Sequence, residues 1–106
     1  MSFGNINPDL FRKAQDVQKN LARLREDLKD RVVDASVAGG LVTAYTNGND
    51  ELVKISIKPE AVDPDDVAML EDLVVAAVQA SLEASQDLQQ KEIAKVTGGL
   101  SLPGLF

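Results

Sequence analysis

Basic side chains gather between positions 12 and 31, and their type and density suit contact with an anionic partner. This segment holds seven basic and four acidic residues, a net charge of +3, whereas the rest of the 106-residue chain holds four basic and thirteen acidic residues, a net charge of −9. The overall charge of −6 therefore hides one positive element. Its cations are Arg12, Lys13, Lys19, Arg23, Arg25, Lys29 and Arg31.

The same cations could instead be a solvated helix face whose charges pair within the helix. Side chains three or four residues apart are neighbours on a helix surface. The pairs at that spacing are Arg12 with Asp16, Arg23 with Asp27, and Glu26 with Lys29. The residues alone leave both interpretations open.

The sequence lacks the residue types that most often carry out catalysis. The chain has no histidine and no cysteine, so the usual general base, the commonest metal ligand and thiolate chemistry are absent. Ser81 and Ser85 have no histidine to activate them. The acids Glu60, Asp63, Asp65 and Asp66 precede an expected helix, where capping explains them better than a metal site does. We expect no enzyme, no metal and no cofactor.

The element carrying the cations is predicted to be a helix over residues 8–30. Asn7 and Pro8 open it, since proline suits the first helical position. Apolar residues then recur at alternating steps of four and three, which is the seam of a heptad. That seam is Leu10, Ala14, Val17, Leu21, Leu24 and Leu28.

Three strands are expected next, over about 31–38, 41–46 and 51–58, because apolar and polar residues alternate there. In the third strand the expected inward set is Val53, Ile55 and Ile57. Gly39-Gly40 supplies the first turn, and Asn47-Gly48 predicts a two-residue primed turn with positive φ at both positions. The pattern is an antiparallel meander.

A second helix is expected over 64–97, with Asp63 as its cap, Pro64 at its first position and Gly98-Gly99 at its end. Its uncharged middle, LVVAAVQASL, is apolar over more than one stripe. Both helices are longer than a six-residue strand, which spans about 20 Å. Their apolar seams therefore extend beyond the sheet, and a second copy of the chain is the simplest partner to bury them. The predicted dimer interface and core are Leu70, Leu73, Val74, Ala77, Val78, Ser81 and Leu82.

The sequence predicts neither a secretory signal nor a membrane-spanning helix. The first residues lack a basic segment followed by an apolar run, and the uncharged stretch is about half the roughly 20 residues that span a bilayer. We expect a cytoplasmic, single-domain protein over 1–106. The apolar tail at 100–106 either packs on its own dimer or docks another protein or a neighbouring dimer.

The order of the elements and several stretches resemble the YbaB/EbfC family of bacterial nucleoid-associated proteins. The most specific of these stretches are GGLV before the hairpin, MLEDLVVAA and the terminal GGLSLPG. The resemblance implies a tweezer-like homodimer with a β core, located in the nucleoid. It also implies binding of double-stranded DNA through the first helix, whose matching residues here are Arg12, Lys13, Lys19, Arg23, Arg25 and Lys29.

The expected fold is therefore α+β, in the order α-β-β-β-α, with a three-stranded antiparallel meander and two long helices. The expected function is organisation or bridging of duplex DNA in the bacterial chromosome, read mainly through phosphates and shape. The alternative is a homodimeric adaptor whose helical arms grip a protein, with DNA contact incidental. The charge of −6 favours the adaptor, and the basic segment favours DNA.

Overall fold

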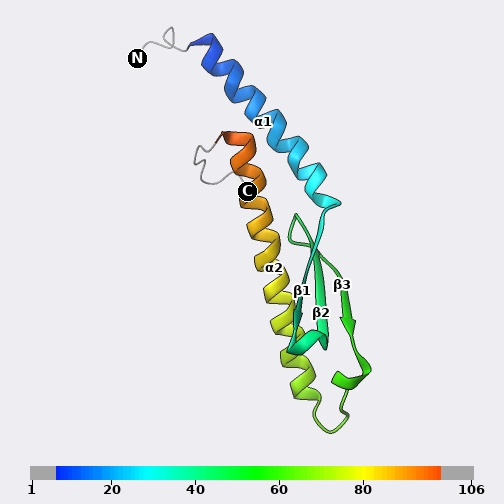
Figure 1. Cartoon of the computed structure of the whole chain (residues 1–106). Coiled ribbons are helices and arrows are strands. Elements are labelled where there is room, and N and C mark those ends of the chain that lie inside the picture. Colours follow the sequence, from blue (N-terminus) through cyan, green and yellow to red (C-terminus); the bar gives the residue numbers. More distant parts are fainter. Residues whose placement is uncertain (1–6, 99–106) are drawn as a thin grey trace.

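The computed structural model describes residues 7–98 and shows one long helix along a small sheet and a second long helix that extends from one end of the sheet (Figure 1). The molecule is strongly elongated, with principal extents of 71 × 25 × 17 Å. The elements in chain order are α1 (Pro8–Lys29), β1 (Val32–Val37), η2 (Ala38–Gly40), β2 (Val42–Asn47), β3 (Leu52–Ile57), η3 (Pro59–Ala61) and α2 (Val67–Thr97). The predicted α-β-β-β-α order is confirmed. The apolar tail lies outside the described residues.

The three strands form one antiparallel sheet in the order β1-β2-β3, as the meander prediction required. Ala35, Ala44 and Ile55 lie side by side across the sheet. α2 packs along one face, mainly on β1 and β2, and then runs past the sheet beside α1 (Figure 1). The prediction for β3 is wrong at Val53. The pairing shifts between Tyr45 and Thr46 so that Leu52 opposes Thr46, and Val53 falls out of register at a bulge.

The core between α2 and the sheet is built from small side chains. Val42, Ala44, Ala61 and Ala77 are fully buried, and larger apolar residues close around them. Small residues let a helix approach a sheet closely. Polar groups in this contact are satisfied within the chain, since the Thr46 hydroxyl donates to the Ser81 carbonyl at 2.9 Å.

α2 begins three residues later than predicted. The side chain of Asp63 accepts a hydrogen bond from the Asp65 N–H at 2.9 Å, and the Asp66 N–H donates back to the Asp63 carbonyl. Asp63 therefore opens a turn, with Pro64 at the position that favours proline. The helix cap is Asp66, whose carboxylate accepts from the Met69 N–H at 3.2 Å. Gly98 ends the helix in the left-handed conformation, with φ of 64°.

The loop between β2 and β3 (residues 47–51, the β2–β3 loop) is where α1 is fastened to the sheet. Four hydrogen bonds run from this loop to carbonyls at the end of α1 and just beyond it. They are Asn49 Nδ2 to Arg25 O at 3.0 Å, Gly48 N to Leu28 O at 2.9 Å, Asn47 Nδ2 to Lys29 O at 3.1 Å, and Gly48 N to Arg31 O at 2.9 Å. The loop thereby adds donors to carbonyls of the last turns of α1 and of the link to β1.

The same loop is also bonded to α2. Gln89 Nε2 donates to the Gly48 carbonyl at 2.6 Å, and the Ser85 hydroxyl donates to the Asp50 carboxylate. Together with the buried leucines Leu21, Leu24 and Leu28 on the inner side of α1, these contacts set the direction in which α1 leaves the sheet.

Gly48 has a different role from the one predicted. Neither Asn47 nor Gly48 has positive φ; within residues 7–98 the positive-φ residue of this loop is Asp50, at 64°. The loop is therefore longer than a two-residue primed turn. A Cβ at Gly48 would lie 2.7 Å from Leu28 Cβ and 2.8 Å from the Leu28 carbonyl oxygen. Glycine is required because α1 comes this close.

Gly48→Ala should lower the free energy of unfolding by about 1–3 kcal/mol, because the added methyl overpacks against the backbone of α1. Chemical denaturation followed by circular dichroism measures it. Gly39→Asn is the control, since asparagine tolerates the φ of 68° there and nothing lies within 4 Å of an added Cβ. Equal stability of Gly48→Ala and the parent protein would refute the close-approach explanation.

Candidate nucleic-acid interface

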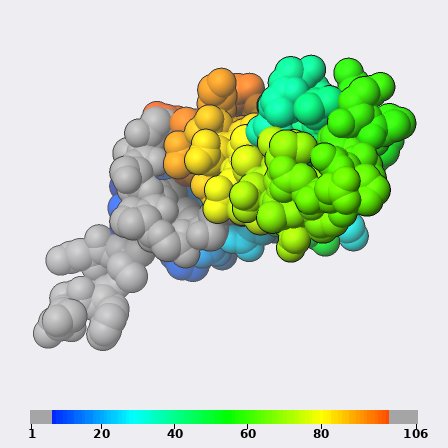
Figure 2. Space-filling model, turned by 90° about the horizontal axis from the view of Figure 1, so that it is seen from below, coloured from blue at the N-terminus to red at the C-terminus, as the bar shows by residue number. Residues whose placement is uncertain are grey.

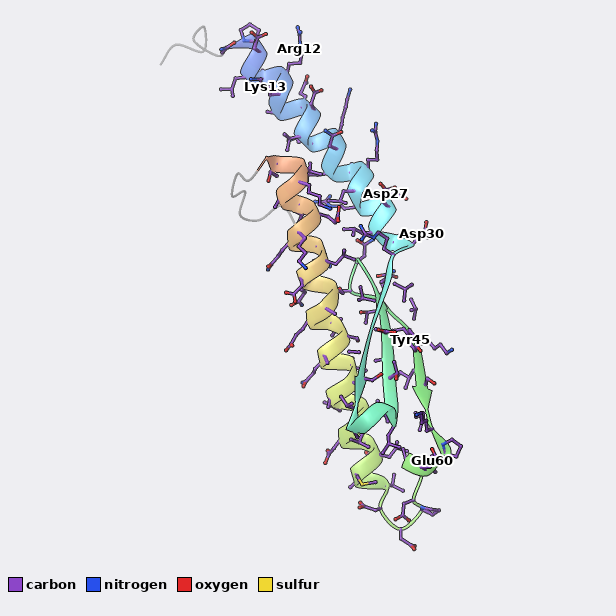
Figure 3. The ribbon with its side chains drawn as sticks, in the orientation of Figure 1. Arg12, Lys13, Asp27, Asp30, Tyr45 and Glu60 are labelled. Atoms are coloured by element: carbon purple, nitrogen blue, oxygen red, sulfur yellow. The ribbon has the colours of Figure 1, made fainter. Side chains whose placement is uncertain are left out.

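The outer part of α1 is a projecting arm. Leu21, Leu24 and Leu28 are buried, whereas Leu10 and Phe11, further out on the helix, are 64% and 56% exposed. The heptad seam is therefore covered only along its C-terminal half within one chain. Figure 3 shows Arg12 and Lys13 near the far end of this arm and Asp27 and Asp30 at its base.

All six predicted DNA contacts are exposed, but they do not share one face of α1. At 3.6 residues per turn, Arg12, Lys19 and Arg23 fall within an arc of about 40° and extend over about 17 Å of the axis. This row, the cationic stripe, lies roughly opposite the buried leucines. The other three predicted contacts lie about 100° or more from the stripe, on the two flanks of the helix; they are Lys13, Arg25 and Lys29.

The alternative interpretation, in which these cations pair with acids of the same helix, is not seen in the ion pairs of the structure. Among residues 7–98 the ion pairs involve none of the spacings Arg12–Asp16, Arg23–Asp27 or Glu26–Lys29. The stripe therefore presents its charge to solvent, where it can meet an anion.

Charge is separated along the length of the molecule. Residues 7–25 contain five basic and two acidic residues, a net charge of +3, on the arm. Residues 58–72 contain one basic and six acidic residues, a net charge of −5, around η3 and the start of α2. Figure 2 looks onto this acidic end, where the green and yellow-green segments form the surface. An overall negative charge is thus compatible with a positive binding surface.

A second cationic group, near the end of α2, is engaged in ion pairs. Arg31 lies 3.2 Å and Lys95 lies 3.0 Å from the Glu92 carboxylate. The hydrogen bond from Lys95, followed by the one from Arg31, holds the pKa of Glu92 below its ordinary value. These contacts join the start of β1 to α2.

The predicted interface residues of α2 lie against the sheet of their own chain. Ala77 and Ser81 are fully buried, Leu82 is half-buried, and the remainder pack around the core; they are Leu70, Leu73, Val74 and Val78. Their position in a subunit interface stays a prediction. Exposed apolar residues lie around them and on the sheet edge; they are Leu52, Val53, Ile57, Val62, Val67, Met69 and Val75.

Residues 7–98 contain neither a candidate metal site nor a candidate membrane span. Among residues 7–98, no three histidine, cysteine or acidic side chains are grouped so as to hold a metal ion. No helix in the same range has the length and apolar character needed to cross a bilayer.

Comparison with known proteins identifies one family over nearly the whole chain. The family model described as the YbaB/EbfC DNA-binding family matches residues 3–100. A nucleoid-associated protein of Acetivibrio thermocellus is 48% identical over 104 residues, covering 97% of this chain and 91% of that protein. A nucleoid-associated protein of Pelotomaculum thermopropionicum is 42% identical over 106 residues and the full length of both.

Among solved structures, the uncharacterized protein HP0035 from Helicobacter pylori has the same fold. It superposes with a TM-score of 0.72 at 21% sequence identity, covering 92% of this chain and 99% of that one.

Glu92→Gln should remove a pH-dependent part of the stability. Because the pKa of Glu92 is lowered in the folded protein, its contribution is present at neutral pH and is lost as the pH falls through that lowered pKa. The urea midpoints of parent and variant should differ at about pH 7 and converge as the pH falls through the lowered pKa of Glu92. Glu83→Gln, an exposed acid of the same helix, is the control. A gap that stays constant with pH would contradict the assignment.

Proposed function

The chain belongs to the YbaB/EbfC DNA-binding family, and on that premise we propose that it binds duplex DNA through the cationic stripe of its projecting α1 arm. The observation that carries the proposal is the row Arg12, Lys19 and Arg23, exposed on the side of α1 away from its buried leucines. The flanking cations Lys13 and Arg25 and the basal Lys29 add to the positive field around it.

Contact with phosphates fits this arrangement better than reading of bases. Cationic side chains along one helix face can neutralise phosphate oxygens regardless of sequence, with affinity that falls as salt rises. The described residues offer few aromatic rings for stacking on single strands: Phe11 lies on the arm, whereas Tyr45 lies on the sheet, where Lys54 covers its ring at 5.4 Å. We therefore propose a nucleoid-associated protein of the cytoplasm that organises or bridges duplex DNA and catalyses no reaction.

A homodimer completes the proposal. α2 has apolar residues around its whole circumference near its start, which is typical of a helix buried on all sides, yet Val67 and Val75 are 54% and 55% exposed in the single chain. Leu52 and Ile57 of the edge strand β3 are also exposed. A second copy would cover this surface and present two arms.

The adaptor role remains the alternative, because the acidic end of the molecule could repel DNA or attract a basic protein. The DNA titration below separates the two roles. Absence of duplex binding at low salt would favour the adaptor.

Replacing the stripe should weaken duplex binding more than replacing the flanks. The stripe variant is Arg12→Gln with Lys19→Gln and Arg23→Gln; the matched control is Lys13→Gln with Arg25→Gln and Lys29→Gln, which removes the same charge. Fluorescence anisotropy with a random duplex between about 50 and 200 mM salt should show a salt slope reduced by about 0.9 for each lost contact in the stripe variant.

Equal loss of affinity in the two triple variants would refute the stripe and leave only a general positive field. Unchanged affinity in both variants would remove the arm from the binding surface altogether. Circular dichroism should show both variants as helical as the parent, since all six side chains are exposed.

Val75→Asp should separate dimerisation from folding. Val75 is exposed in the single chain, so the variant is expected to fold but to dissociate, whereas Val74→Asp places a charge against the core and should unfold the chain. Light scattering gives the mass, and circular dichroism gives the folded fraction. A Val75→Asp protein that keeps the mass of a dimer would exclude this surface as the interface.

A further inference from the structure

The Asn47-Gly48 pair carries a chemical liability that the β2–β3 loop holds in check. In an Asn-Gly sequence the glycine nitrogen can attack the side-chain carbonyl carbon of asparagine. A new N–C bond closes a cyclic imide, the C–N bond of the side-chain amide breaks, and ammonia leaves. Water then opens the imide to aspartate or isoaspartate. Glycine permits this reaction because it has no Cβ to obstruct the ring closure.

In the folded protein both reacting groups are occupied. The Gly48 N–H, which must lose its proton before attack, donates to two carbonyls, those of Leu28 and Arg31, each at 2.9 Å. The Asn47 side chain is only 4% exposed. Its amide donates to the Lys29 carbonyl at 3.1 Å and to the Glu51 carboxylate at 3.0 Å.

The carbonyl end of the Asn47 side chain is held as well. Its Oδ1 accepts from the Asn49 N–H at 2.9 Å and from the Glu51 N–H at 3.0 Å. Attack requires the Asn47 side chain to turn towards the Gly48 nitrogen. That rotation breaks the bond to Lys29 and the bonds to Asn49 and Glu51, and deprotonation of Gly48 breaks the bonds to Leu28 and Arg31. The bonds to Leu28, Lys29 and Arg31 are the ones that join the loop to the end of α1 and the residues that follow it.

We propose that Asn47 is a deamidation site that is protected by the docked base of α1, and that its deamidation releases the arm. Protection should depend on local opening of α1 from the loop, because Leu10 and Phe11 at its outer end are exposed and its base is held by three leucines and the loop bonds. Deamidation then proceeds at the rate of the open form multiplied by the population of that form.

The product cannot rebuild the same contacts. Aspartate at position 47 has no N–H to give to the Lys29 carbonyl, and its carboxylate replaces an amide that lies 3.0 Å from the Glu51 carboxylate. Two like charges at that distance repel. Isoaspartate also lengthens the main chain by one carbon between Asn47 and Gly48, where Gly48 has no room to shift towards Leu28. Either product leaves the arm less firmly attached.

The test measures deamidation of the full-length protein during incubation near neutral pH. Peptide mapping by mass spectrometry, with separation of the isoaspartyl peptide, gives the rate at Asn47 in the folded protein and in urea. The folded protein should react at least about tenfold more slowly, since protection of this size needs the open form to be a minor species. Equal rates in the two conditions would overturn the proposal.

Two variants distinguish arm opening from global unfolding. Asn49→Ala leaves the reacting pair intact but removes the bond to the Arg25 carbonyl, so deamidation should become several-fold faster. Thr43→Ala is the control, because it removes a hydrogen bond to Ser36 on the outer face of the sheet. Equal acceleration in both variants, or none in Asn49→Ala, would overturn protection by the arm.

The variant Asn47→Asp tests whether deamidation releases the arm. Hydrogen exchange should be faster for the amides of residues 25–31 and unchanged for those of 42–46. If this variant does not fold, the deamidated protein recovered after incubation is measured in its place. Unchanged exchange at 25–31 would overturn release of the arm. None of these readouts involves DNA, so the proposal stands or fails independently of the proposed function.

Discussion

The close approach of the α1 backbone to Gly48 is the contact on which the rest of the structure depends. At this point the loop donates hydrogen bonds to carbonyls at the end of α1, and the same loop is bonded to α2 through Gln89 and Ser85. The two helices, which are far apart in the sequence, are therefore both bonded to one small loop of the sheet. The direction of the arm, and with it the position of every cation on the arm, is set mainly from its base, because the buried leucines of α1 lie in its C-terminal half and Leu10 and Phe11 further out are exposed.

The elements were predictable from the sequence because their patterns are local. A heptad seam and a period of two are properties of consecutive residues, so the helices and strands follow from them. The sequence-based predictions are wrong where a contact with a distant residue, or a competing turn, determines the local structure. Gly48 looked like a turn glycine, but it is glycine because Leu28 lies against it. Asp63 looked like a cap, but it makes a turn with Asp65 first. The bulge at Val53 depends on pairing with β2, which no pattern within β3 contains.

The candidate site was predictable in composition but not in arrangement. The sequence alone places six cations on one helix; which of them stand on the same face as Arg12 follows from helical geometry, and which part of the helix projects follows from the tertiary structure. Leu10 and Leu24 belong to one seam by spacing, yet one is 64% exposed and the other is buried. The end of α2 shows the same limit, since Arg31 belongs to the basic segment by sequence but is engaged by Glu92 in the fold.

The separation of charge along the 71 Å molecule has a consequence for how coated DNA would look from outside. If the basic arms lie on phosphates, the acidic segment at residues 58–72 is directed away from the duplex. The phosphates of a duplex covered in this way would be neutralised by the arms, and the acidic segments would form a new negative surface further from the DNA axis. Neighbouring coated segments would then repel one another at a larger distance. The protein would then act as a negatively charged layer that keeps neighbouring duplexes apart.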